Sequence, residues 1–308
     1  MYKYILKRLL MMLPVLIGVI LIIFTLMYIT PGDPASILLG EQARPEALAA
    51  LREEMGLNDP FFVQFVNYVG RVLQLDLGTS YVTKRPVFLE IYDRFYSTML
   101  LAGLSSILSV IIGIPMGILC AIKQNKFFDS ITQVLGLIAL SMPNFWLGLM
   151  LMLIFSVNLG WLPATGFSTP MHWILPTMTI GLSSAGVIMR FTRSSMLEVI
   201  RQDYMRTARA KGQKESVIIM KHALKNTLIP VITIVGLTFG GLLGGAILTE
   251  TVFAISGLGN YMVQSIRSRD MPIIQGGVLM MAIVFSFVNL LVDILYSYID
   301  PRIRSQYK

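Results

Sequence analysis

Residues 9–30 read LLMMLPVLIGVILIIFTLMYIT and contain no charged side chain. A helix needs about 20 predominantly apolar residues to cross the ~30 Å hydrocarbon core of a bilayer, so this stretch predicts a membrane-spanning segment. Because unpaired backbone amides and carbonyls are costly in lipid, such a segment is expected to be helical. Further apolar runs of similar length predict spans near 98–122, 132–158, 173–190, 228–250 and 276–299.

The whole composition is that of a polytopic membrane protein. Of the 308 residues, 55% are hydrophobic and only 14% are charged, whereas soluble domains have about 45–50% apolar and 25% charged residues. The single cysteine, Cys120, excludes an intrachain disulfide, and two histidines, His172 and His222, offer no Cys/His spacing of a metal site. We therefore expect an all-α fold with six spans in one transmembrane domain over residues 1–308, and no metal.

The basic residues predict the orientation. With the N-terminus in the cytoplasm, 17 Lys and Arg residues fall in cytoplasmic segments and 8 fall on the opposite side. Because this bias sets the topology of membrane proteins, both termini are predicted to be cytoplasmic. The same bias accounts for the net charge of +8, so the charge does not indicate that the protein binds nucleic acid. The first span follows Lys3, Lys7 and Arg8 like a signal peptide, but its apolar run exceeds the 7–15 residues of such a peptide, and Pro31-Gly32-Asp33-Pro34 replaces a cleavage site. An uncleaved anchor is expected.

The extracytoplasmic segment predicted at 31–97 is too long for a simple connection. Residues 45–56 are expected to form a helix that Pro opens and Gly closes. Asp59 is expected to cap a second helix that begins at Pro60, and Pro86 to begin a third. The apolar stripe of the second helix has two open uses, packing on the outer ends of the spans or serving as a platform for an external partner. This stripe consists of Phe61, Phe65, Tyr68, Val69 and Val72.

Ionisable residues are rare within the predicted spans. Asp293 lies inside the last span and Glu250 at the outer end of the fifth, and a structural partner for each is favoured over a proton relay. Secondary transporters tend to keep ionisable groups at the midplane. The chain also lacks a G-x-x-x-x-G-K-[ST] phosphate loop and an H-E-x-x-H zinc helix. It is not expected to be an enzyme, to have catalytic residues, or to bind ATP itself.

The fifth span contains Gly236, Gly240 and Gly244 at four-residue spacing. Small residues at this spacing let helix backbones approach closely in lipid. Two interpretations remain open: tight packing within the chain, or a moving or inter-subunit seam around a pathway.

The largest predicted cytoplasmic loop, 190–227, carries nine Lys and Arg residues. Asp203 is expected to be the N-cap and Gly212 the left-handed residue after the last turn, which predicts a two-turn helix over 204–211. A second helix is expected from about 214 to 225.

The first loop helix has little apolar surface beyond Met205, Ala208 and Ala210. Binding to a lipid surface would need a bulky apolar stripe, which is absent. Small residues flanked by cations instead favour insertion into a protein groove with charged walls. These cations are Arg206, Arg209 and Lys211.

This loop carries a resemblance to a known family. Residues 203–212, continuing through His222-Ala223-Leu224-Lys225-Asn226 to Ile229-Pro230, resemble the loop signature of permease subunits in bacterial ABC importers. Further motifs resemble the first permease of the dipeptide, oligopeptide, nickel and glutathione branch: Pro31-Gly32-Asp33-Pro34, Asp76-Leu77-Gly78, Pro143-Asn144-Phe145, Gly160-Trp161-Leu162-Pro163 and Gly257-Leu258-Gly259.

The resemblance implies a type I importer fold, a bacterial inner-membrane location and several partners. These partners are a second homologous permease, two cytoplasmic ATPases that bind ATP and Mg²⁺, and an extracytoplasmic solute-binding protein, for which 31–97 and 251–275 are candidate surfaces. Arg206 stands where the wider family has Glu, which departs from the pattern. The residues implied to contact an ATPase are Asp203, Tyr204, Arg206, Thr207, Ala208, Arg209, Ala210, Lys211 and Gly212.

The resulting hypothesis is a permease subunit that moves short peptides or similar small solutes and is coupled to a separate ATPase through 203–212. The alternative is a secondary transporter or channel that works alone.

Overall fold

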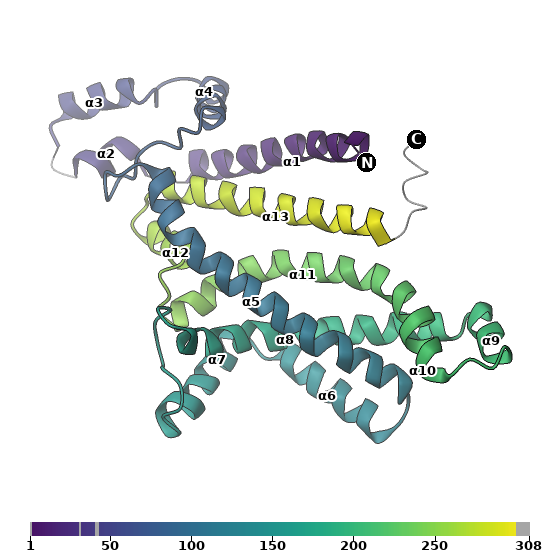
Figure 1. Cartoon of the computed structure of the whole chain (residues 1–308). Helices are drawn as coiled ribbons and strands as arrows, with labels where there is room; N and C mark the ends of the chain where they lie inside the picture. The colour runs from purple at the N-terminus through teal and green to yellow at the C-terminus, as the bar shows by residue number, and fades with distance from the viewer. Residues whose placement is uncertain (1, 31, 41–42, 300–308) are drawn as a thin grey trace. The chain divides into compact units, whose positions relative to one another are not determined.

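The computed structural model describes residues 2–30, 32–40 and 43–299, which form helices and one isolated β-bridge (Figure 1). The elements are α1 Tyr2–Ile29, α2 Pro34–Leu39, α3 Pro45–Glu54, α4 Phe61–Leu73, α5 Val87–Ile122, α6 Phe127–Ser141, α7 Asn144–Met152, the π-helix η1 Leu153–Asn158, α8 Pro170–Ile200, α9 Asp203–Ala210, α10 Glu215–Val217, the π-helix η2 Ile218–Ala223, α11 Leu224–Val252, α12 Leu258–Arg267 and α13 Met271–Ile299.

The chain divides into two compact units, which are described separately. The first contains residues 97–256 with the described parts of 1–5 and 287–308, and the second contains 6–96 and 257–286.

Five described helices are long and apolar enough to cross a membrane, and a bent pair supplies a sixth if it is counted as one span. The expectation of an all-α polytopic fold is confirmed. The predicted span 132–158 is not one straight helix, however, because α6 and α7 meet at 102°. Met142 at the break has an extended backbone, with φ −76° and ψ 128°. Met142 precedes Pro143, and a residue that precedes proline is disfavoured in the helical conformation.

The fourth span and the loop after it also differ from expectation. The span was predicted at 173–190, but α8 runs from Pro170 to Ile200 and Pro176 does not end it. The helix predicted over 214–225 is not separate, because α10, η2 and α11 follow one another without a break. The connection predicted at 190–227 therefore shrinks to the residues between Ile200 and Glu215, with α9 in the middle.

The first unit is built around α8, which packs against α6, α7 and α11. Glycines permit the closest approaches. A Cβ added at Gly117 would lie 2.6 Å from the carbonyl oxygen of Met189, and one at Gly186 would lie 2.8 Å from the carbonyl oxygen of Gly136. In lipid, where apolar burial does not drive helices together, such backbone contact is a main source of packing energy.

The second unit packs α4 on the end of α1. The ring of Phe24 lies 5.4 Å from Phe61, 5.6 Å from Phe65 and 5.7 Å from Tyr68, centroid to centroid. The stripe predicted for this helix therefore packs on a span, near the C-terminal end of α1, which corresponds to the first of the two uses left open. Two details were wrong: Pro60 is the N-cap residue and Asp59 does not cap, and the third short helix is the start of α5, at Val87.

Candidate functional site

The two-turn helix predicted over 204–211 exists as α9, Asp203–Ala210 (Figure 1). Its first residue differs from expectation. Gln202 is the N-cap, with extended backbone, and no side chain caps the helix, so the prediction that Asp203 is the N-cap was wrong. Asp203 instead places its carboxylate in the first turn, where a negative charge interacts favourably with the helix dipole.

The C-terminal end of α9 is as predicted. Gly212 has φ +73°, a left-handed conformation that glycine adopts without steric cost. Its N–H donates to the carbonyl of Arg209 at 2.9 Å, and the N–H of Gln213 donates to the carbonyl of Ala208 at 3.4 Å. These two bonds form a Schellman motif, which satisfies carbonyls at the end of the helix and fixes where it stops.

Met205 anchors α9 to its own chain. Its side chain is fully buried in a cluster with Met196 of α8 and with Ile218, Ile219 and Ala223 of η2. Ala208, one turn later, is half-buried against the same cluster. Sequence reasoning counted Met205 as apolar surface of the helix and placed Ala208 in the predicted contact set, but this side of α9 is occupied by the chain itself.

Polar contacts tie α9 to the helix that follows it. Arg209 donates to both carboxylate oxygens of Glu215, at 3.1 and 2.8 Å. This hydrogen bonding raises the pKa of Arg209. Asn226 donates to the hydroxyl of Tyr204 at 2.8 Å. The Arg209–Glu215 pair is exposed, and such pairs contribute little stability, so it orients the helix while Met205 supplies the attachment.

The opposite side of α9 is exposed. Within the described part of the chain, Arg206 makes only a 3.7 Å ion pair with Asp203, and their side chains are 76% and 98% exposed. This side of α9 therefore presents cationic side chains, Arg206 among them, and no bulky aliphatic side chain. The other exposed residues of the predicted contact set are Tyr204, Thr207, Arg209, Ala210, Lys211 and Gly212.

An ion pair fixes the end of α8 from which α9 follows. Asp129 of α6 accepts two hydrogen bonds from the Arg193 guanidinium, both at 2.7 Å. The backbone N–H of Asn125 and the amide of Gln133 also donate to this carboxylate, each at 3.0 Å. Asp129 is 1% exposed. Sequence reasoning missed this pair because the two charges are 64 residues apart.

An open hollow of about 500 Å³ lies beside the same end of α8. Positively and negatively charged side chains both line this hollow. A polar protein surface would therefore fit it better than a lipid would. The lining residues are Arg193, Ser194, Leu197, Glu198, Arg201, Gln202 and Asp203.

Comparisons with known proteins identify the family. Residues 113–305 match the family described as "Binding-protein-dependent transport system inner membrane component", and residues 1–102 match the N-terminal part of such membrane components. The chain belongs to this family. It is a permease subunit of an ABC importer, and the predicted resemblance is confirmed.

Curated relatives match along the whole permease. The dipeptide transport system permease protein of Alkalihalophilus pseudofirmus is 46% identical, with 99% of this chain and 100% of the relative covered. The glutathione transport system permease proteins of Pectobacterium atrosepticum and Salmonella typhimurium are 47% and 46% identical, with 99% of both chains covered.

Solved transporters share the fold. The MetNI methionine ABC transporter, in an inward-facing conformation, is similar with a TM-score of 0.59 at 17% identity, over 69% of the permease and 97% of that chain. An amino acid ABC transporter crystallised with histidines has a TM-score of 0.54 at 14% identity, over 68% and 94%. At these identities the likeness concerns the helical architecture alone.

The predicted glycine series of the permease has unequal surroundings. A Cβ at Gly236 would lie 2.4 Å from Val292 of α13, whereas one at Gly244 would meet nothing within 4 Å. Gly236 thus packs closely against α13 of the same chain. A wider seam through Gly240 and Gly244 stays a prediction. Glu250 is fully buried and accepts a hydrogen bond from Thr98 at 2.5 Å, a structural partner as expected.

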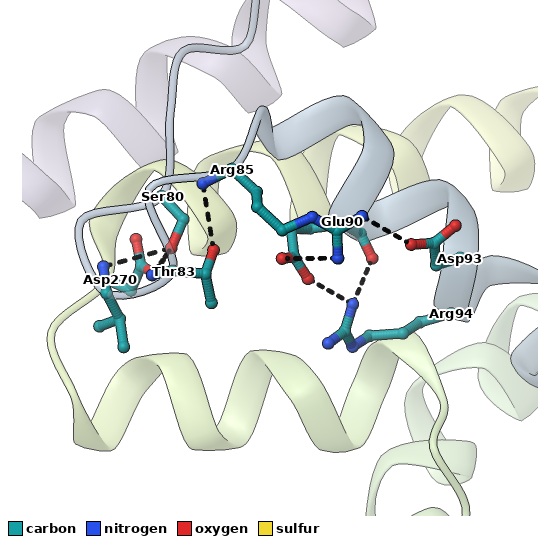
Figure 2. Close-up of polar contacts among 8 residues, drawn as sticks. Ser80, Thr83, Arg85, Glu90, Asp93, Arg94 and Asp270 are labelled. Atoms are coloured by element: carbon teal, nitrogen blue, oxygen red, sulfur yellow. Dashed lines mark hydrogen bonds and ion pairs between the residues drawn. The ribbon is translucent and has the colours of Figure 1, made fainter.

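In the second unit, a polar network joins residues of the two segments that were predicted as surfaces for a binding protein (Figure 2). Asp270, which is 2% exposed, accepts hydrogen bonds from the Ser80 hydroxyl and, at 3.0 Å, from the Tyr81 N–H. Buried Glu90 pairs with Arg85 at 3.3 Å and with Arg94 at 2.5 Å. The network fixes the turn around residues 80–86 against the junction of α12 and α13.

Proposed function

We propose that this permease imports short peptides as one of two homologous permeases in the bacterial cytoplasmic membrane, with α9 as its coupling helix. In this arrangement an external binding protein supplies the solute, and two partner ATPases bind ATP and Mg²⁺. Both chain ends and α9 lie in the cytoplasm. The transport systems to which the relatives belong support the substrate class, since dipeptides and glutathione are both short peptides.

One observation carries the coupling role: α9 is attached on one side and exposed on the other. Met205 is fully buried among residues of α8 and η2, while Arg206 on the exposed side contacts, among the described residues, only the exposed carboxylate of Asp203. A lever needs this combination, because a force on the exposed side must reach the spanning helices without the short helix detaching. Closure of an ATPase dimer then reorients the spans as rigid bodies.

Uptake measurements test this function. A strain that lacks the chain, complemented with the wild-type gene, is expected to accumulate a labelled dipeptide only when its partner ATPases are intact. Replacing the phosphate-loop Lys of those ATPases is expected to reduce the initial rate at least tenfold, because the chain has no phosphate loop of its own. Uptake that survives this replacement but stops when the proton gradient collapses supports the stand-alone secondary transporter instead. Parallel uptake assays with labelled glutathione and Ni²⁺ rank the three solutes by their initial rates of uptake.

A further inference from the structure

A cavity of about 800 Å³ lies in the second unit, apart from α9 and its surroundings. It is bordered by the end of α1, by α2, α3 and α4, by the turn at 76–81 and by the first turn of α13. This volume lies within the ~300–1,000 Å³ of sites that enclose small molecules. The cavity is thus large enough for a small solute, and no part of the coupling machinery borders it.

Two arginines line the cavity, and they differ in their partners. The guanidinium of Arg52 donates to Asp33 at 2.9 and 3.1 Å. Burial opposes ionisation of Asp33, but Arg52 outweighs it and leaves the pKa of Asp33 lowered. The side chain of Arg71, in the last turn of α4, forms no ion pair and no hydrogen bond with any described residue. Arg71 is therefore the cation available to a ligand.

Two tyrosines lie near Arg71. Tyr68 as a residue is only 7% exposed and lines the cavity, and its hydroxyl forms no hydrogen bond with any described residue. The oxygen is not among the fully buried unpartnered atoms, so it is accessible to a ligand. Burial raises the pKa of Tyr68 to about 12, and burial together with Asp270 raises the pKa of Tyr81 to about 12, with the charge of Arg71 acting against both shifts. Both phenols are donors at neutral pH.

The rest of the cavity lining carries groups that can pair with those of a peptide. Carboxylates of Glu54 and Asp76 can accept from an ammonium group, and the ring of Phe24 gives an apolar wall. Side-chain amides can pair with peptide N–H and C=O groups. The amide residues are Asn58, Gln64, Asn67 and Gln275.

We propose that this cavity binds a short peptide with a free carboxylate, held by the Arg71 guanidinium and by the hydroxyls of Tyr68 and Tyr81. The choice of a peptide rests on the proposed function. A phospholipid would also offer an anionic group, but its acyl chains need a long apolar channel, and amides and carboxylates on several sides of this cavity do not provide one. The site would hold solute on the permease itself, at the C-terminal end of α1 and the first turn of α13.

Direct binding tests the proposal in the complete permease–ATPase complex, reconstituted in nanodiscs of phosphatidylcholine and phosphatidylglycerol. The probe is tritiated Ala-Phe, measured by equilibrium dialysis against its C-terminal amide. Arg71→Gln is expected to weaken Ala-Phe binding at least tenfold, and Tyr68→Phe several-fold, because charge-assisted and buried hydrogen bonds are lost. Arg71→Lys is expected to restore part of the affinity, and the amide to bind at least tenfold more weakly than the acid.

Arg44→Gln is the matched control. It removes the same charge from an exposed residue beside α3 that does not line the cavity, and it is expected to leave the affinity unchanged. The proposal is overturned if the acid and the amide bind equally, or if Arg44→Gln and Arg71→Gln weaken binding alike. It is also overturned if mass spectrometry finds phosphatidylglycerol that the wild type retains, Arg71→Gln releases and Ala-Phe does not displace.

The two proposals fail separately. Arg71-dependent binding of Ala-Phe without any ATP-driven uptake contradicts the importer function and leaves the site. Normal uptake by the wild type, with binding that does not depend on Arg71, contradicts only the site.

Discussion

Asp129→Ala is expected to lower the free energy of unfolding by about 3 kcal/mol, because it leaves the charge of Arg193, whose side chain is only 18% exposed, without its partner. The lost carboxylate accepts two bonds from Arg193 and one each from Asn125 and Gln133. It also joins the start of α6 to the end of α8 from which α9 follows. Equilibrium unfolding of the purified permease in mixed micelles measures this loss.

The control for this variant is Asp203→Ala, which removes a carboxylate that is 98% exposed and is expected to change stability by less than about 0.5 kcal/mol. In a second comparison, Asp129→Ala combined with Arg193→Met is expected to regain much of the loss, since apolar replacement of a buried ion pair is often tolerated. Equal destabilisation by Asp129→Ala and Asp203→Ala contradicts the structural role of the pair.

Met205→Asp is expected to reduce ATP-driven dipeptide uptake at least tenfold while the chain still inserts into the membrane. The substitution places a carboxylate in a fully apolar cluster, where an unpaired charge is strongly disfavoured. The helix α9 then separates from α8 and η2, so force on its exposed side no longer reaches the spans. Initial uptake rates, normalised to the amount of chain in the membrane, measure the effect.

Two variants control for side effects of the Met205 substitution. Met205→Leu keeps the volume and the apolar character and is expected to retain uptake, since such exchanges usually cost less than about 1.5 kcal/mol. Met220→Asp introduces the same charge at a methionine of η2 that is 59% exposed. Wild-type uptake by Met205→Asp refutes the anchoring role, as does an equal loss in Met220→Asp.

The sequence predicted most of the fold because its signals are local. An uncharged run such as 9–30 has few alternatives to a spanning helix, and Gly212 marks the end of α9 by its own backbone freedom. The bend between α6 and α7 was missed even though Pro143 is visible, because hydropathy stays high through the break and a proline can also be accommodated within a helix, as Pro176 is in α8.

The site was predicted less completely because the residues that hold α9 and the end of α8 in place are far apart in the sequence. Hydropathy ended the fourth span near Arg190, whereas α8 continues and Arg193 is compensated by Asp129, 64 residues away. Met205 was counted as surface because its burial depends on Met196 and Ile218, which local patterning does not place beside it. The sequence therefore located α9 but not the contacts that attach it to α8 and η2.

The most direct test of α9 as the coupling helix is a crosslink to the ATPase in the complete complex. With Cys120 replaced by Ala, a cysteine replaces exposed Ala210, and half-buried Ala208 and exposed Ala47 of α3 receive it as comparisons. We predict that Ala210→Cys crosslinks to the ATPase with a yield that changes on ATP addition, that Ala208→Cys crosslinks more weakly, and that Ala47→Cys does not crosslink. A thiol at position 210 that is readily alkylated yet never crosslinks, in a complex whose uptake does not require ATP, would contradict the account.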